Sequence, residues 1–138
     1  MPSRYLKWTL KAIHIYNGER TMKIDEQIKE LLIHHLPNRY EDTLSCYDMW
    51  RHEDWKDMNP DGTINGFISY FFLDFKFDMI ITAQWDNKFS KAQWKLIRDT
   101  VVNRTKPIRI QSDPSNPILH KIAKKYGGKF VEDEIWFK

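Results

Sequence analysis

The sequence predicts one α/β (α+β) domain in which helices flank a mixed, mostly antiparallel sheet. Its 138 residues are enough for one compact domain and too few for two ordinary ones, so residues 1–138 are expected to form a single domain. Hydrophobic residues make up 41% of the chain and aromatic residues 14%, which excludes an intrinsically disordered protein. The spacing of the apolar residues also changes along the chain, between the alternation of strands and the longer period of helices.

The first third of the chain predicts a strand and two helices. Apolar and polar residues alternate over Leu6–Ala12, which is typical of a half-buried strand. Helical spacing then predicts a helix over Ile24–His35, ended by the Pro-Asn pair at 37–38. A second, less regular helix is expected over Asp42–Met58, before the turn residues 59–62.

The middle of the chain predicts strands. Residues 63–85 are rich in β-forming types, and apolar side chains occupy both faces from Phe67 to Phe75, which is typical of a central strand. A tight connection near Asp74–Asp78 would turn the chain back onto Met79–Ala83. The pattern leaves open whether two or three strands occupy this region.

A helix is predicted from Ser90 to about Asn103. Ser90 and Gln93 have the spacing of a capping box, in which each side chain accepts a hydrogen bond from the backbone of the other. The residues expected to face inward are Phe89, Gln93, Leu96, Ile97, Thr100 and Val101.

Strand, helix and strand complete the chain. Pro107–Gln111 is a short strand, Asn116 opens a helix with proline at its first position, and Lys129–Phe137 is one final strand. A strand, a helix and a strand in succession favour a right-handed parallel crossover. We therefore predict that Met79–Ala83 and Ile108–Gln111 run parallel and splay apart, which leaves a cleft beside the helix between them.

Four segments carry a resemblance to a known family. They are Met79–Trp85, the helix from Phe89, Ile108–Ile110, and Asn116–Phe130, where asparagine opens a helix and glycine and an aromatic residue lead into the last strand. On these residues the chain resembles the GCN5-related N-acetyltransferases (GNAT), and its C-terminal half resembles the small GNAT-like proteins of tailed bacteriophages. The resemblance implies an acyl-CoA-dependent N-acyltransferase, with acetyl-CoA as cofactor and an amine as acceptor.

The resemblance also implies where the cofactor lies. The backbone N–H groups expected to meet its pyrophosphate belong to Asn87, Lys88, Phe89, Ser90 and Lys91. Asn116 would lie near the pantetheine arm. Family members carry a Gly-rich turn here, whereas Gln84–Ser90 contains no glycine.

Candidate catalytic residues follow from the acid and the base that acyl transfer to an amine requires. Tyr126 is the only tyrosine on the last helix and is the candidate acid, with the alternative that it packs in the core along the apolar stripe. His52, Glu53 and Asp54 are candidates for the base, with the alternative that they belong to a solvated helix face.

Other reactive residues suggest no further chemistry. Adjacent His34 and His35 lack the i, i+4 spacing of a metal-binding pair, so no metal site is expected. Cys46 is the only cysteine, which excludes an intramolecular disulfide and suits a small buried hydrophobe. Four lysines between positions 121 and 129 are expected to form a solubilising face.

Three function classes remain. The first is the acyl-CoA-dependent N-acyltransferase. The second, which needs no cofactor loop, is a catalytically silent GNAT-like accessory protein with a phage virion or host protein as partner. The third, a nucleic-acid-binding module, is supported only by a net charge of +3 and is disfavoured. Without a signal peptide or a membrane-spanning apolar run, the expected location is the host cytoplasm or the virion.

Overall fold

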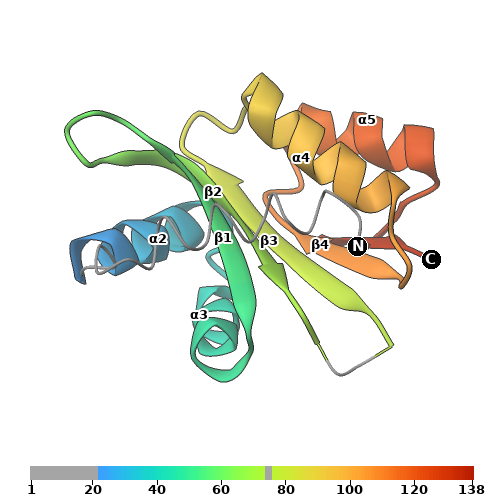
Figure 1. The fold of residues 1–138 in the computed structure, drawn as a ribbon, viewed down its shortest axis with the longest axis horizontal. Helices are drawn as coiled ribbons and strands as arrows, with labels where there is room; N and C mark the ends of the chain where they lie inside the picture. Colours follow the sequence, from blue (N-terminus) through green and yellow to red (C-terminus); the bar gives the residue numbers. More distant parts are fainter. Residues whose placement is uncertain (1–21, 74–75) are drawn as a thin grey trace.

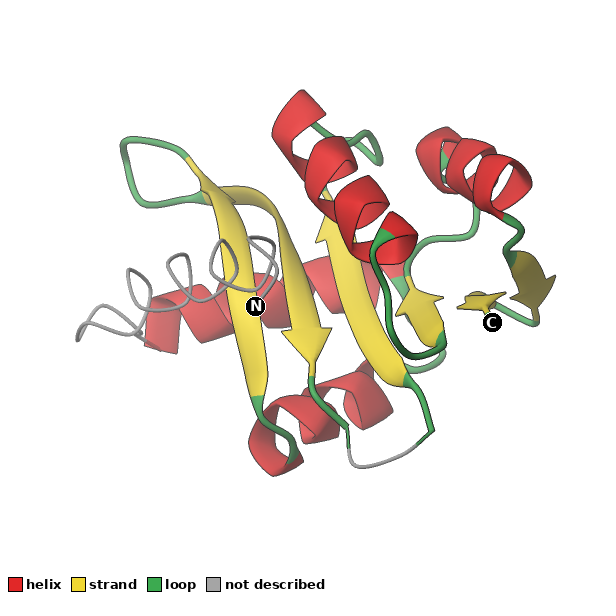
Figure 2. Ribbon diagram, turned by 45° about the vertical axis from the view of Figure 1, so that its right-hand side comes forward, coloured by secondary structure: helices red, strands yellow, loops and turns green. Residues whose placement is uncertain are grey.

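The structure is a computed structural model that describes residues 22–73 and 76–138. Six strands form one sheet in the order β1-β2-β3-β4-β6-β5, with α2 and α3 on one side and α4 and α5 on the other (Figure 1, Figure 2). In chain order the elements are α2 (Met22–His35), α3 (Tyr40–Met49), β1 (His52–Met58), β2 (Ile64–Phe71), β3 (Asp78–Gln84), α4 (Lys91–Val102), β4 (Ile108–Gln111), α5 (Pro117–Tyr126), β5 (Lys129–Val131) and β6 (Glu134–Phe137).

The sheet buries a hydrophobic cluster on each face. On one face Ile68, Ile80 and Ile110 pack against α4 and α5. On the other face Phe67 and Phe71 pack against α2, with side chains of α3 at the edge of the cluster. Because successive side chains alternate between faces, β2 is apolar on both, which confirms the predicted central strand.

The predicted parallel crossover is confirmed. β3 pairs with β4 in parallel over four residues, from Asp78 opposite Ile108 to Ile81 opposite Gln111. β3 then runs on through Thr82–Gln84, which pair with β2. We call the place where the carboxyl ends of β3 and β4 part the β3–β4 fork.

Local capping signals identify both C-terminal helices correctly. Ser90 and Gln93 form the predicted capping box at the start of α4. The side chain of Asn116 caps α5, and Gly127 ends it in the left-handed conformation with φ 78°. The residues of α4 expected to face inward are buried, and Phe89 packs half-buried against the same cluster.

The predicted helix over Asp42–Met58 is wrong in its second half. The helix ends at Met49, and residues 52–58 form β1, at one end of the described strand order. His52, Asp54 and Lys56 share the β1 face on the α3 side, so its inward face is polar. The strand therefore lacks the apolar alternation by which a sequence reveals a strand.

The last strand is a hairpin rather than one strand. β5 and β6 pair antiparallel about a turn in which Glu132 takes the left-handed conformation with φ 58°. Glutamate seldom adopts that conformation, and no glycine or asparagine marks the turn. Residues 63–85 hold two strands, β2 and β3. The predicted strand Leu6–Ala12 lies outside the described residues.

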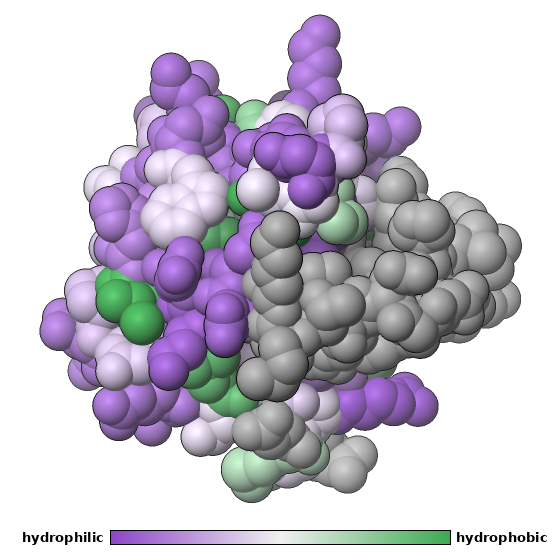
Figure 3. Space-filling model, turned by 90° about the vertical axis from the view of Figure 1, so that its left-hand side faces the viewer, coloured by the Kyte–Doolittle hydropathy of each residue, from purple (hydrophilic) through white to green (hydrophobic). Residues whose placement is uncertain are grey.

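The surface on the α2 side carries hydrophobic residues only as small separate patches among hydrophilic ones, outside the atoms drawn in grey (Figure 3). Within residues 22–73 and 76–138, no helix has the length and apolar character that crossing a membrane requires.

Candidate functional site

The β3–β4 fork brings together the two loops that follow the parallel strands. Ligands of open sheets bind at the carboxyl ends of parallel strands, where neighbouring loops diverge. Residues 85–90 connect β3 to α4, and residues 112–116 connect β4 to α5. Asn87 Nδ2 donates to Ser115 Oγ at 2.8 Å, which joins the two loops.

Side-chain amides hold the start of α4 against β3. Gln93 Nε2 donates to Gln84 Oε1 at 2.7 Å, and Gln84 Nε2 donates to Asp57 Oδ2 at 3.3 Å. Gln93 is fully buried and also completes the capping box. Gly66 lies opposite Gln84, and a Cβ at Gly66 would lie 1.7 Å from Gln84 Oε1, so the amide needs glycine there.

The glycine-free loop makes its turn through Asn87. This residue has φ 54°, in the left-handed region that asparagine enters more readily than most other non-glycine residues. Its N–H donates to the carbonyl of Gln84 at 2.9 Å. Because the capping box uses the N–H groups of Ser90 and Gln93, those of Lys91 and Ala92 are left for water or a ligand.

A hollow of about 560 Å³ lies beside this loop. Lys88, Phe89 and Ser90, three of the predicted cofactor residues, line it. The carboxylates of Asp57 and Asp86 line it too, and they oppose the attraction of Lys88 for a phosphate.

The hydrogen bonds of the Asn116 side chain show whether the residues at the fork suit an acyl-CoA. Its side chain is buried, and its Oδ1 accepts a hydrogen bond from the N–H of Ile118 at 2.9 Å. Its Nδ2 is buried and has no hydrogen-bond partner in the described part of the chain. An unpaired buried donor costs about 1–3 kcal/mol and calls for an explanation such as a ligand that supplies the acceptor. Pantetheine carbonyls are such acceptors, so the residues at the fork fit the cofactor that the resemblance implies.

His35 and Asp113 form a pair at the fork that the sequence analysis missed. His35 Nδ1 donates to Asp113 Oδ2 at 2.9 Å. The ring of His35 also lies 6.3 Å from that of Trp85, the first residue after β3. His35 Nε2 is buried and unpaired within the described residues. An imidazole that a carboxylate orients through Nδ1, with Nε2 unpaired, has the arrangement of a general base.

The pKa of Asp113 is lowered from its ordinary value. Burial acts to raise this pKa, but hydrogen bonds from His35 and Ser115, together with the charge of His35, outweigh it. The hydroxyl and the N–H of Ser115 both donate to Asp113 Oδ1. Asp113 is therefore ionised at neutral pH and accepts the Nδ1 proton of His35.

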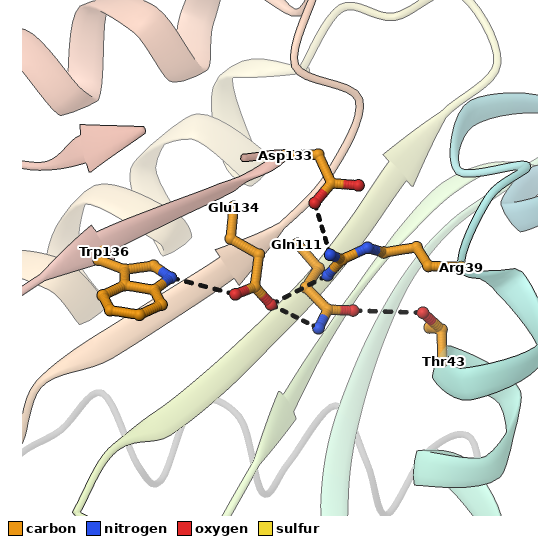
Figure 4. A network of polar contacts seen from close by, with 6 residues as sticks. All are labelled: Arg39, Thr43, Gln111, Asp133, Glu134 and Trp136. Carbon is orange, nitrogen blue, oxygen red and sulfur yellow. Dashed lines mark hydrogen bonds and ion pairs between the residues drawn. The ribbon is translucent and has the colours of Figure 1, made fainter. Parts of the chain in front are cut away.

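A second hollow, of about 440 Å³, lies between α3 and the β5–β6 turn. In the polar network beside it (Figure 4), Thr43 Oγ1 donates to Gln111 Oε1 at 3.2 Å, and Gln111 Nε2 donates to Glu134 Oε2 at 2.7 Å. Arg39 bridges Asp133 and Glu134. Gln111, which lines this hollow, lies two residues before Asp113 in the chain.

Cys46 lines the same hollow. Burial raises the pKa of its thiol above the ordinary value, and the carboxylate of Asp42 raises it further. The thiol is therefore protonated at neutral pH. It packs half-buried against the hydrophobic cluster between the sheet and α2, in agreement with its interpretation as a small hydrophobe.

The predicted base residues lie on β1, which is separated from β3 by β2. Asp54 accepts a hydrogen bond from Ser69 Oγ at 2.6 Å and has Lys56 Nζ at 3.3 Å and His52 Nε2 at 3.5 Å. Glu53 lies on the opposite face of the strand by alternation. These residues occupy a strand with a buried polar face instead of the solvated helix face stated as the alternative, and their catalytic role stays a prediction.

Tyr126 ends α5 and is partly buried against the cluster of that face, in agreement with the packing alternative. Asn116 begins the same helix, so ten residues of helical rise place Tyr126 about 15 Å from the fork. The helix that carries Tyr126, α5, contacts β5 and β6, and β1, which carries the predicted base, lies four strand spacings from β6, or about 19 Å. The structure therefore does not bring the predicted acid and base together.

Among the predicted cofactor residues, Asn87 reaches across the fork to Ser115, the residue before Asn116, and the role of these residues in cofactor binding stays a prediction. The pairing of His35 with Asp113 escaped notice because the two residues lie 78 positions apart, which no spacing pattern can reveal. In the described ranges no group of three or more His, Cys, Asp or Glu side chains is placed to hold a metal ion.

Comparison with known proteins bears on the fold. No family model matches the chain, and no curated protein matches it. The crystal structure of Tetrahymena GCN5 is similar, with a TM-score of 0.56 and 12% sequence identity, over 88% of this chain and 89% of that chain. The protein therefore has a GNAT-like α+β fold, as the resemblance predicted, whereas the likeness to bacteriophage proteins stays a prediction.

Proposed function

We propose that the protein is an acyl-CoA-dependent N-acyltransferase that works at the β3–β4 fork. The observation that carries this proposal is the unpaired, buried Nδ2 of Asn116 beside the loop that begins α4. The N–H groups of Lys91 and Ala92 and the side chain of Lys88 would bind the phosphates of the cofactor. When bound, acetyl-CoA supplies the acyl group as an activated thioester.

His35 is the base in this proposal. An amine is protonated at neutral pH and must lose a proton before its nitrogen can attack a carbonyl carbon. The His35 ring, held through Nδ1 by Asp113, would accept that proton at Nε2. His35 replaces His52, Glu53 and Asp54 in this role because it lies at the fork.

The acceptor amine would enter through the 440 Å³ hollow, whose lining residue Gln111 lies two residues before Asp113. Asp42, Glu132 and Asp133 line this hollow, and Arg39 is the basic side chain among its described lining residues. Three carboxylates against one guanidinium favour a cationic acceptor. The acid that protonates the leaving thiolate is not assigned, and phage or host partners rest on the resemblance alone.

The experiment that tests this function measures release of free CoA from acetyl-CoA in the presence of primary amines, polyamines and lysine peptides. His35→Gln should lower kcat by about 10²-fold if the imidazole is the base. It should leave binding of acetyl-CoA intact. His34→Gln is the matched control, because His34 is the exposed neighbour on the same helix. Absence of transfer to every acceptor, or unchanged turnover in His35→Gln, would contradict the proposal.

A further inference from the structure

Arg109 is held between two aromatic rings. Its guanidinium carbon lies 3.8 Å from the ring centre of Phe77 and 3.8 Å from that of Trp136. Phe77 precedes β3, and Trp136 lies directly opposite Arg109 in the β4–β6 ladder, so the rings come from both neighbours of β4. A planar guanidinium stacked in this way is restricted in its orientation.

The ring of Trp136 is itself held in place. Its Nε1 donates to Glu134 Oε1 at 3.0 Å, and Glu134 in turn accepts from Arg39 and Gln111 (Figure 4). The stacked arrangement around Arg109 therefore exists before any ligand binds, which lowers the entropic cost of binding.

The edge of the Arg109 guanidinium is available to a ligand. The side chain of Arg109 makes no hydrogen bond or ion pair to any residue in 22–73 or 76–138. Arg39 and Arg98, by contrast, are paired with carboxylates. Aromatic rings cover both faces of the Arg109 guanidinium. Its remaining binding surface is the edge that carries the N–H donors, which matches the geometry of a phosphate or carboxylate.

Arg109 lies in a groove of about 590 Å³ whose charge suits an anion. Five basic side chains line it, and no carboxylate side chain appears among its described lining residues. The basic residues are Lys76, Arg104, Arg109, Lys129 and Lys138. The guanidinium of Arg104 donates to the main-chain oxygens of Val101 and Lys138. The rest of the lining is largely aromatic and apolar, and the volume suits a small molecule.

We propose that this groove binds a small organic phosphate with a planar apolar body. The N–H groups at the edge of the Arg109 guanidinium bind the phosphate with help from neighbouring lysines. The apolar lining of the groove contacts the planar apolar body of the ligand. The groove is formed by the amino ends of β3 and β4 and the end of α5, so it is separate from the fork at the other end of these strands. This site is independent of the proposed acyl transfer.

The test is calorimetric titration of the protein with phenyl phosphate, inorganic phosphate and benzoate. Phenyl phosphate should bind more tightly than inorganic phosphate, which lacks the apolar body, and more tightly than benzoate, which carries a single charge. Arg109→Gln should weaken the binding of phenyl phosphate about tenfold or more, because charge-assisted hydrogen bonds are lost. Arg109→Lys should also weaken it, because lysine keeps the charge without the planar fork.

Controls separate recognition from folding. Arg98→Gln removes an arginine that stacks on one ring, Trp94, and is paired with Asp99, so it should bind phenyl phosphate like the parent. Lys129→Gln changes an exposed lining residue and should weaken binding without loss of folding. Thermal unfolding of each variant checks that it is folded. No binding of phenyl phosphate by the parent, tighter binding of benzoate, or equal affinity in folded Arg109→Gln would overturn the proposal.

Discussion

Cys46 is the chain's only cysteine, so a thiol reagent reports on one side chain. Burial and then Asp42 raise the pKa of its thiol, which lowers the thiolate fraction at neutral pH. We expect iodoacetamide to alkylate the folded protein at neutral pH more slowly than the urea-unfolded chain, as followed by mass spectrometry. Asp42→Asn should raise the rate partway, because burial remains. Equal rates for the folded and unfolded protein would contradict this assignment.

Asp113 predicts how stability depends on pH. Its pKa is lower in the folded protein than the value of about 3.9 expected for a free aspartate. Its ionised form therefore stabilises the fold above that pH, and this contribution is lost as pH falls through the folded-state pKa. Asp113→Asn should thus be less stable than the parent at neutral pH, with a deficit that shrinks below about pH 4.

Urea unfolding of the parent and of Asp113→Asn, at neutral pH and below about pH 4, measures how the stability deficit changes with pH. Glu30→Gln, a change at an exposed residue of α2, controls for the loss of one negative charge. A deficit of the same size at both pH values would mean that Asp113 stabilises the fold through contacts that do not involve its charge.

At the scale of elements, β1 depends on a buried ion pair. The side chains of Lys56 and Asp54 are 2% and 1% exposed, and their charged groups lie 3.3 Å apart. Asp54→Ala would leave the ammonium group buried without this carboxylate, at a cost of about 3–5 kcal/mol in unfolding free energy. Adding Lys56→Met should recover most of this loss, because an apolar side chain of similar length needs no partner.

Chemical denaturation of the two variants and the parent gives both values. If Asp54→Ala is as stable as the parent, the ion pair does not stabilise β1. If adding Lys56→Met to Asp54→Ala recovers no stability, the buried charge on Lys56 is not the cause of the loss.

The elements also show what the sequence can reveal. α4 and α5 were predicted nearly to the residue because Ser90, Gln93, Asn116 and Gly127 act on backbone groups within one turn of them. β1 was missed because its inward face is polar, and its pairing depends on β2, which no local pattern in residues 52–58 records. The β5–β6 turn was missed because glutamate occupies a position that usually selects glycine or asparagine.

At the scale of the whole molecule, the parallel β3–β4 pair positions the site. The pair ends after Ile81 and Gln111, and the two loops beyond it are joined by Asn87 and Ser115. The positions of Asn87–Lys91 and Asn116 in the fold were predictable because these residues follow one strand and begin two helices. The histidine pair was not, because α2 and the loop after β4 meet only when the sheet and its covering helices are assembled.

The central claim is that the fork binds acyl-CoA, and calorimetric titration with acetyl-CoA tests it most directly. We expect the parent to bind one equivalent and to melt at a higher temperature with ligand, because a ligand of the native state stabilises it. Asn116→Ser keeps an oxygen that can cap α5 but removes the unpaired amide, so it should fold normally and bind more weakly. No heat and no thermal shift with millimolar acetyl-CoA, or equal affinity in Asn116→Ser, would contradict the account.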